Sequence, residues 1–399
     1  MVRAYAGRRR RVFPSTHGNI PLENLDSALL LNPKEHVYTF LREQGLKQVA
    51  THTLSPPCTM SISLCYNSPG LLLLHSPKTR GPFHSNHSSS KQEHAQNRNE
   101  LKFVRGKKLL KHLSTWGIGG PCNHFIQVFD QTQLVSAVRY CDEHSIRFIV
   151  IGKGSNCLFD DLGFDGWVIL NRIEFLEKKE PGVYTVGSGF RFNKLGVKCS
   201  NEGFTGLEFA GVIPGSVGGA TYMNAGANGQ ETADSVHCVD IITKDGKCHR
   251  LSRSYLNFGY RSSPFQDMQE LAAINAVTFK LQQSELAKRT LYEYMERRVS
   301  QPVEEQSAGS VFRNPSDMGV AAAELIDKAG LKGFRVGGAM VSKIHANFFI
   351  NCGGSTSQDM LELIARVKEK VDQKFAVQLK EEVTYINPHY GDVDPDKDR

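Results

Sequence analysis

The sequence lacks two features that would each point to a class of protein, a long apolar run and a CxxC pair. It has no apolar run near the roughly 18 residues that a membrane helix needs, and its longest block of leucines is at residues 71–74. Its nine cysteines include no CxxC pair, which argues against a zinc site and against a disulfide framework. We therefore expect a soluble chain with no membrane span, no bound metal and reduced thiols.

The part of the chain that we expect to fold also has little net positive charge. The formal net charge is +7, but residues 1–100 carry 12 basic and 6 acidic residues, which leaves only +1 for residues 101–399. A nucleic-acid surface needs basic residues gathered on one element of a folded domain. No later segment shows such a cluster, so we expect no nucleic acid among the partners.

Residues 1–100 differ in composition from the rest. They hold a basic cluster at residues 8–11, a serine-rich stretch at residues 85–91 and few acidic residues. Basic, serine-containing segments of this kind are typical of organelle transit peptides, and the hydrophobic core of a secretory signal is missing. We predict a disordered targeting extension at 1–100. The expected location is the plastid (chloroplast) in a plant or alga, and the cytoplasm otherwise.

The most unusual stretch that is present is residues 203–231, GFTGLEFAGVIPGSVGGATYMNAGANGQE. Its glycines disfavour helix and strand interiors, because each loses backbone entropy and offers no side chain to pack. Its apolar residues argue against disorder. The small residues around Pro214 would leave backbone N–H groups free to point at an anion such as a pyrophosphate. We predict a ligand-binding loop here rather than an ordinary surface loop.

From about residue 107 the pattern alternates between strands and helices. Residues 133–144 have the spacing of a helix, and a turn at residues 244–247 predicts a hairpin. The strand at 147–151 ends in a second small-residue loop, at residues 152–156. That loop suits phosphate contacts, but no GxGxxG opens a helix there, so a Rossmann site is not supported. Strands are predicted at 125–129, 147–151, 167–170, 183–186, 236–243 and 271–281.

A second α/β unit begins near residue 286. It starts with a charged helix, continues with a serine-containing loop at residues 307–315, and includes helices at 320–329 and 357–375. Residues 378–386 are predicted to form its last strand. The expected division is a targeting extension at 1–100, a first domain at 107–282 and a second domain at 286–390.

Six motifs that follow one another in order resemble a known family. They are IGKGSN at 151, GLEFAGVIPGSVGGATYMNAG at 206, YRSSPF at 260, AGSVFRNP at 308, AGLKGFRVGGAMVSKIHANFFIN at 329 and LKEEV at 379. Together they resemble the UDP-N-acetylenolpyruvoylglucosamine reductases, the MurB family, in its branch with a shorter loop. The resemblance implies an α/β (α+β) fold, in which a PCMH-type FAD-binding domain is followed by a smaller α/β substrate-binding domain.

The resemblance also implies the chemistry. The family reduces UDP-N-acetylglucosamine enolpyruvate to UDP-N-acetylmuramate, a peptidoglycan precursor, with NADPH as co-substrate and non-covalent FAD as cofactor. It assigns stabilisation of the developing negative charge to Arg261 and Glu382, and donation of the proton to Ser310. The implied FAD contacts are Gly152, Gly154, Ser155, Asn156, Gly215, Ser216, Gly218, Gly219, Asn224 and Gly226. The implied substrate contacts are Asn314, Lys332 and His345.

Two alternatives stay open at this point. Neighbouring strand residues face opposite sides, so Glu381 could face inward in place of Glu382, which we choose from the position of the following valine. The chain could also be another PCMH-type flavin oxidoreductase, acting on a different sugar or alcohol, or a non-catalytic flavin-binding relative. Enzymes of the former kind often tether FAD through His or Cys, and Cys157 adjoins the first small-residue loop.

Overall fold

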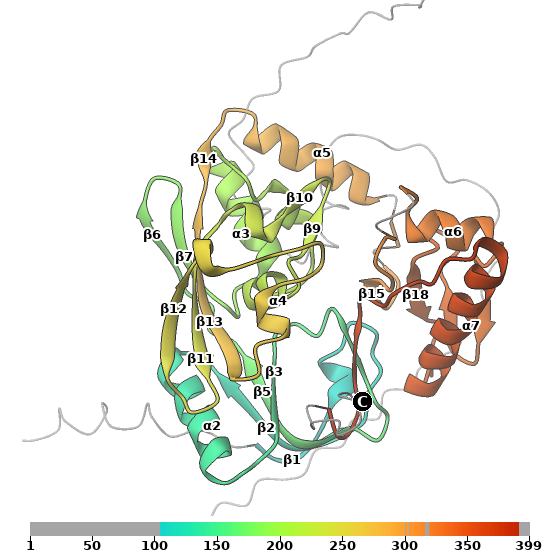
Figure 1. Cartoon of the computed structure of the whole chain (residues 1–399), viewed down its shortest axis with the longest axis horizontal. Helices are drawn as coiled ribbons and strands as arrows, with labels where there is room; N and C mark the ends of the chain where they lie inside the picture. The colour runs from blue at the N-terminus through green and yellow to red at the C-terminus, as the bar shows by residue number, and fades with distance from the viewer. Residues whose placement is uncertain (1–103, 300, 303, 316–318, 391–399) are drawn as a thin grey trace, which may run out of the picture. The chain divides into compact units, whose positions relative to one another are not determined.

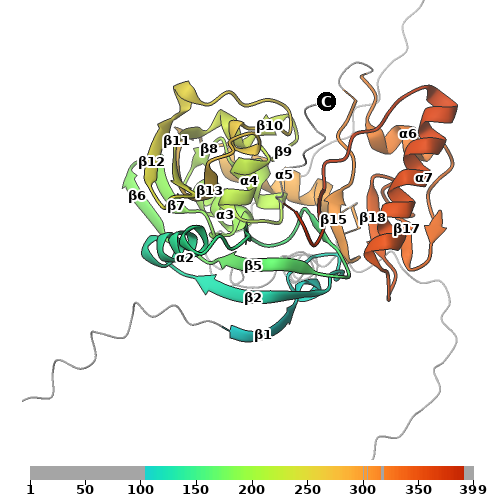
Figure 2. The same ribbon diagram turned by 60° about the horizontal axis from the view of Figure 1, so that its bottom comes forward.

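The structure is a computed structural model that describes residues 104–299, 301–302, 304–315 and 319–390. The predicted targeting extension at 1–100 lies outside the described residues. Figure 1 and Figure 2 show the described elements from two directions.

The first layer is a four-stranded sheet with the order β1-β2-β5-β3. Strands β2 and β3 run parallel to β5, and α2 connects them. The carboxylate of Asp130 caps α2 by accepting the N–H of Gln133 at 2.8 Å, and the apolar side of α2 packs in one cluster with the sheet. The bounds are β1 Val104–Leu109, β2 Pro121–Val128, α2 Gln131–Glu143, β3 Phe148–Ile151 and β5 Phe164–Asn171.

The second layer is an antiparallel five-stranded sheet with the order β12-β11-β13-β7-β6. One face of this sheet packs against α3, α4 and the 3-10 helix at Glu208–Val212, and that packing forms a large apolar cluster. The glycine-rich stretch therefore lies against a sheet. The bounds are β6 Leu176–Glu180, β7 Val183–Gly187, α3 Phe192–Asn201, α4 Val217–Tyr222, β11 Val236–Thr243, β12 Cys248–Ser252 and β13 Leu271–Lys280.

The C-terminal part contains a four-stranded sheet with the order β15-β18-β17-β16, packed against α6 and α7. Thr356 and Asp359 form a capping box at the start of α7, as expected for a hydroxyl residue just before a helix. The bounds are β15 Ser307–Ser310, α6 Ala322–Lys328, β16 Arg335–Val336, β17 Ala339–Val341, β18 Phe348–Asn351 and α7 Ser357–Phe375. Helix α5 (Ala287–Val299) precedes this part in the chain and packs against α3 and the 3-10 helix of the second layer.

Two segments cross between these parts. The last strand, β19 (Thr384–Ile386), leaves the C-terminal part and pairs in parallel with β4 (Cys157–Phe159), directly after the loop at 152–156. In the other direction, the indole of Trp116 is fully buried in the C-terminal cluster and donates to the Phe349 carbonyl at 2.7 Å. These crossings fix the C-terminal residues beside the first small-residue loop.

Most sequence-predicted elements are confirmed within a few residues, including the charged helix near residue 286 and the helices at 320–329 and 357–375. Two expectations were wrong. Residues 203–231 contain a true helix, α4, in spite of their glycines, because Val217 and Ala220 pack into the apolar cluster beside them. The predicted strand at 378–386 is regular only at Thr384–Ile386.

Neither a membrane span nor a metal centre is found in the described ranges. No described helix combines enough length with enough apolar character to cross a bilayer. In the same ranges, no three His, Cys, Asp or Glu side chains gather in a way that could hold a metal ion.

Candidate active site

The two small-residue loops predicted from the sequence lie against each other. A Cβ placed on Gly152 would come within 2.2 Å of the Ser216 hydroxyl oxygen, and the Ser155 hydroxyl donates to the Pro214 carbonyl at 3.2 Å. A side chain at 152 would displace this hydroxyl, which caps α4. The structure thus brings together segments that are about sixty residues apart in sequence.

Gly154 shows why this loop needs glycine. Its φ is +60°, a left-handed conformation that costs other L-residues roughly 1–2 kcal/mol. A Cβ at this position would also lie 1.8 Å from the Leu113 carbonyl oxygen. Both the conformation and the lack of space exclude a side chain.

The two loops offer backbone donors to an anion, although not all those we expected. The N–H groups of Gly218 and Gly219 already donate within the protein, to the Ser188 carbonyl at 2.8 Å and to the Ser216 hydroxyl at 3.3 Å, and the contact of these two residues with the cofactor stays a prediction. Both lie in the first turn of α4, which Ser216 caps. The backbone N–H groups of Gly154, Ser155, Gly215 and Ser216 donate no hydrogen bond to any other described residue. These four donors suit a diphosphate.

The two asparagines assigned to the cofactor by resemblance have protein partners. Asn156 donates from Nδ2 to the Glu382 carbonyl at 3.0 Å. The buried Asn224 donates to Glu231 and to the Gly259 carbonyl, each at 2.8 Å, and accepts the N–H of Ala233 at 3.0 Å. Their contact with FAD remains a prediction. In the structure, both side chains hold neighbouring segments in place.

Arg261 sits on a strained turn. Gly259 and Ser262 exchange two backbone hydrogen bonds of 3.0 Å, and Arg261 occupies the third position with a φ of +53°. Glycine is the usual residue where a tight turn needs a positive φ. A strained non-glycine residue persists only when its surroundings hold it, and such residues gather at functional sites.

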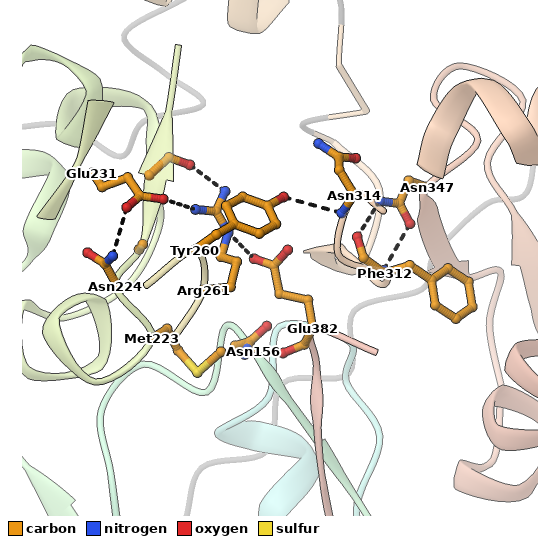
Figure 3. A network of polar contacts seen from close by, with 12 residues as sticks. Asn156, Met223, Asn224, Glu231, Tyr260, Arg261, Phe312, Asn314, Asn347 and Glu382 are labelled. Atoms are coloured by element: carbon orange, nitrogen blue, oxygen red, sulfur yellow. Dashed lines mark hydrogen bonds and ion pairs between the residues drawn. The ribbon is translucent and has the colours of Figure 1, made fainter. Parts of the chain in front are cut away.

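The guanidinium of Arg261 is held from several sides (Figure 3). Nε donates to Glu382 at 2.9 Å, and Nη2 donates to the Gly226 carbonyl at 2.7 Å. Nη1 lies 3.9 Å from a carboxylate oxygen of Glu231, and the guanidinium carbon lies 5.0 Å from the centre of the Tyr260 ring. The side chain is only 15% exposed. Its orientation is therefore set before any ligand binds.

Glu382 is the carboxylate that faces Arg261, with a side chain 18% exposed. Burial raises the pKa of its carboxyl group, while Arg261 and Arg313 pull that pKa down. Glu381 points elsewhere and pairs with Lys368 of α7 at 2.8 Å. The choice that sequence left open is thus settled in favour of Glu382 as the partner of Arg261.

Ser310 ends β15, next to the segment that carries Glu382. The Val311 carbonyl accepts the N–H of Glu382 at 2.7 Å. The buried Asn347 fixes the serine segment from the other side, because its Oδ1 accepts the N–H of Phe312 at 3.0 Å and its Nδ2 donates to the Phe312 carbonyl at 2.8 Å. The structure therefore brings Ser310 and Glu382 onto adjoining backbone segments.

Asn314 links the serine segment to the arginine turn. Its backbone N–H donates to the Tyr260 hydroxyl at 3.2 Å, and its side-chain oxygen accepts the N–H of Ala322 at the start of α6 at 3.0 Å. The Tyr260 hydroxyl thus connects the turn that carries Arg261 with the loop that follows Ser310.

The other two predicted substrate residues lie beyond Ser310. Ser310 pairs with Phe348, whose ring centre is 4.7 Å from that of His345. Burial lowers the pKa of His345, and the positive charges of Lys332 and Arg298 lower it further. Its buried Nδ1 has no hydrogen-bond partner among the described residues. Lys332 pairs with Asp327 at 2.7 Å. Cationic groups therefore gather beside the serine strand.

Cys157, the residue considered for a covalent cofactor link, is poorly suited to it. Burial raises the pKa of its thiol to about 11. The thiolate is the nucleophilic form of cysteine, so this thiol is a weak nucleophile near neutral pH.

Two family models match the chain. An FAD binding domain matches residues 122–252, which hold both small-residue loops. The C-terminal domain of UDP-N-acetylenolpyruvoylglucosamine reductase matches residues 301–386, which hold Ser310 and Glu382. These matches and the fold define an FAD-dependent oxidoreductase with a PCMH-type cofactor domain.

Whole-chain relatives narrow this class. The chain is 48% identical over 279 residues to UDP-N-acetylenolpyruvoylglucosamine reductase of Protochlamydia amoebophila, covering 70% of this chain and 92% of that protein. It is 44% identical over 278 residues to the enzyme of that name from Chlamydia trachomatis, with 69% and 94% covered. The crystal structure of the reductase from Thermus caldophilus matches with a TM-score of 0.60 and 34% identity, over 72% of this chain and 98% of that one. The chain belongs to the UDP-N-acetylenolpyruvoylglucosamine reductase (MurB) family, as its motifs predicted.

Sequence reasoning missed two residues of this site. Tyr260 stands inside the YRSSPF motif and Glu231 ends the glycine-rich stretch, yet neither received a role. The positive φ of Arg261 and its contacts with both residues become visible only in the folded chain.

Proposed function

We propose that this chain reduces the enolpyruvyl ether of UDP-N-acetylglucosamine enolpyruvate to the lactyl ether of UDP-N-acetylmuramate, with NADPH as reductant. The observation that carries this proposal is the Arg261–Glu382 pair, held between the small-residue loops and the Ser310 strand of a MurB-family chain. Bound FAD supplies the hydride that it has taken from NADPH. Gly154, Ser155, Gly215 and Ser216 would hold its diphosphate.

Arg261 and Glu382 stabilise the negative charge that develops on the substrate carboxylate and its neighbouring carbon. A guanidinium fixed in advance stabilises such charge without reorganising, a contribution often worth several kcal/mol. A carboxylate next to the growing charge would oppose it, so Glu382 must carry a proton. Burial favours that form by raising the pKa of Glu382.

Ser310 gives a proton to the carbanionic carbon. A serine hydroxyl is a weak acid, so it must be held rigidly to act. The bulge and hydrogen bonds around Ser310, Val311 and Asn347 supply that rigidity.

The cationic groups beyond Ser310 suit the diphosphate of the UDP-sugar. Lys332, with Asn314 and the neutral His345, would contact that substrate, since ammonium, amide and imidazole groups bind phosphate oxygens. The support is their position beside the strand that ends in Ser310.

The test is oxidation of NADPH by the purified full chain, with and without the enolpyruvyl sugar nucleotide. We expect a yellow protein that releases its flavin on denaturation and turns over NADPH only with that substrate. A colourless protein that gains no flavin spectrum on adding FAD would overturn the proposal.

We further propose that residues 1–100 direct the chain to the plastid of a plant or alga. Their basic, serine-containing and acid-poor composition supports this, as does the match of curated relatives to only 70% of the chain. A fluorescent fusion of residues 1–100 should enter plastids, and a fusion of residues 101–399 should stay in the cytosol. A uniform cytosolic signal from both fusions would contradict the proposal.

A further inference from the structure

Glu231 closes a short hairpin beside the arginine turn. Strands β9 (Gly226–Ala227) and β10 (Gln230–Glu231) pair so that Glu231 lies opposite Gly226, whose carbonyl accepts from Arg261. The hairpin turns at Asn228 and Gly229, which both have a positive φ, as the tight two-residue turns of hairpins require. The turn fixes where the Glu231 side chain leaves the backbone.

Glu231 is held by three groups. Asn224 donates to one carboxylate oxygen at 2.8 Å, and Glu231 forms a capping box with Asp234, whose carboxylate accepts the Glu231 N–H at 2.8 Å. The third group is Arg261, whose Nη1 lies 3.9 Å from the other oxygen. That distance is an ion pair and not a hydrogen bond. Glu231 therefore contributes charge to Arg261 more than a directed bond.

The space between these groups is full. A Cβ on Gly226 would lie 3.2 Å from Arg261 Nη1 and 3.0 Å from the Glu231 Cγ. The guanidinium and the glutamate thus both lie close to the Gly226 backbone, which leaves no room for a side chain there.

The negative charge of Glu231 matters because of the charges around Glu382. The charged groups that face Glu382 are Arg261 and Arg313, both cationic. Both lower the pKa of the Glu382 carboxyl group, against burial, which raises it. Glu231 provides a second carboxylate on the far side of Arg261, as Figure 3 shows. With Glu382 protonated, Glu231 and the substrate carboxylate balance the two arginines.

We propose that Glu231 is a positioning residue for the reduction, which holds the Arg261 guanidinium in place and balances its charge so that Glu382 can stay protonated beside it. The inference rests on the proposed function, because it requires Glu382 to act in its acid form.

The inference predicts a shift in pH dependence. Activity needs protonated Glu382, so the rate falls as the pH rises through the pKa of that group. Without the negative charge of Glu231, Arg261 and Arg313 favour the carboxylate form, and the pKa of Glu382 falls. The alkaline limb of the pH–rate profile then moves to lower pH.

The variant to test is Glu231→Gln, which keeps the shape, the partner Asn224 and the ability to cap, but removes the charge. Oxidation of pre-reduced enzyme by the enolpyruvyl sugar nucleotide is followed by stopped flow across pH. We expect the alkaline limb to move down by about 0.5 to 1 pH unit, and reoxidation on that limb to slow about three- to tenfold. Glu231→Asp keeps the charge and should retain the wild-type limb.

Glu381→Gln is the matched control. It removes a neighbouring carboxylate that pairs with Lys368 and not with Arg261, so it should leave the limb in place. A wild-type enzyme that is not reoxidised by the sugar nucleotide would refute the proposed function itself. An active wild type with an unchanged limb in Glu231→Gln would overturn only the part given to Glu231. A Glu231→Gln chain that cannot fold would also overturn it, because the group would then be purely structural.

Discussion

The two small-residue loops and the arginine turn use the same backbone conformation for opposite purposes. At Gly154 a left-handed φ goes with a position where a neighbouring carbonyl leaves no room for a side chain. At Arg261 a left-handed φ presents a large side chain that four neighbours hold. The proposed cofactor site therefore depends on missing side chains, and the proposed catalytic site depends on one strained side chain. Substitutions in the first region should remove flavin, and those in the second should keep flavin and slow the chemistry.

The most damaging change should be Gly154→Ala. The new Cβ would meet the Leu113 carbonyl oxygen, and the φ of +60° adds strain. We expect a cost of about 3 kcal/mol in the free energy of unfolding and purification without flavin. The ratio of flavin to protein absorbance and thermal unfolding measure these effects.

Gly330→Ala is the control for Gly154→Ala. Gly330 has a φ of +77° but no atom within 4 Å of an added Cβ, so strain alone should cost about 1 kcal/mol and flavin should stay bound. A Gly154→Ala protein that keeps its flavin and is as stable as Gly330→Ala would show that cofactor binding does not depend on the missing side chain at 154.

Ser310→Ala should be the largest change on the catalytic side. It removes the proposed proton donor but touches neither small-residue loop, so flavin binding and flavin reduction by NADPH should survive. Reoxidation by the enolpyruvyl substrate should slow about 10²- to 10⁴-fold, the usual contribution of general acid catalysis. Stopped flow separates the two half-reactions. Slower flavin reduction with intact reoxidation would show that Ser310 is not the donor.

The raised pKa of Glu382 should affect how the free energy of unfolding depends on pH. Its folded pKa is raised, so the stability it contributes is fully present below its unfolded value and is lost as the pH rises through the folded value. The unfolding free energy of the wild type minus that of Glu382→Gln should therefore fall between pH 4 and pH 7. A change of about 1 kcal/mol corresponds to a shift near one pKa unit. A difference that grew with pH would mean that Arg261 dominates over burial.

Tyr260→Phe should have the smallest effect. It keeps the ring under Arg261 and removes only the acceptor of the Asn314 N–H. A lost hydrogen bond of about 1 kcal/mol predicts a two- to tenfold decrease in kcat/KM, with flavin content unchanged. Steady-state kinetics would detect it. A decrease beyond about a hundredfold would instead place the hydroxyl in the chemistry.

Much of the fold could be predicted because the local pattern and the tertiary contacts agree. The strand at Phe148–Ile151 and the helix at Ser357–Phe375 have the expected periodicity and pack as that periodicity requires. The failures come from long-range contacts. Residues before Thr384 are not a regular strand, because the backbone around Glu382 instead bonds Val311 of the serine segment.

The proposed catalytic trio of Arg261, Ser310 and Glu382 rests on resemblance to a family, and the residues that support it in the structure could not be predicted from the sequence. Nothing in the motif around Arg261 reveals that its backbone is strained or that Asn224 holds its turn. The direction of the Glu382 side chain also depends on how the C-terminal segment crosses to the first domain, which the local sequence does not show. Such information lies in contacts between segments far apart in the chain, each of which looks ordinary alone.

The parallel pairing of β19 with β4 has a consequence for synthesis on the ribosome. Cys157–Phe159 is made early, but its partner Thr384–Ile386 is made only after the whole C-terminal part. Chains usually fold domain by domain as they emerge, yet here the first domain waits with an open strand edge until nearly the end of translation. Flavin capture should accordingly be a late event, and a nascent chain stalled before Thr384 should bind FAD poorly. Completion of the cofactor domain thereby reports that the substrate domain has already been made.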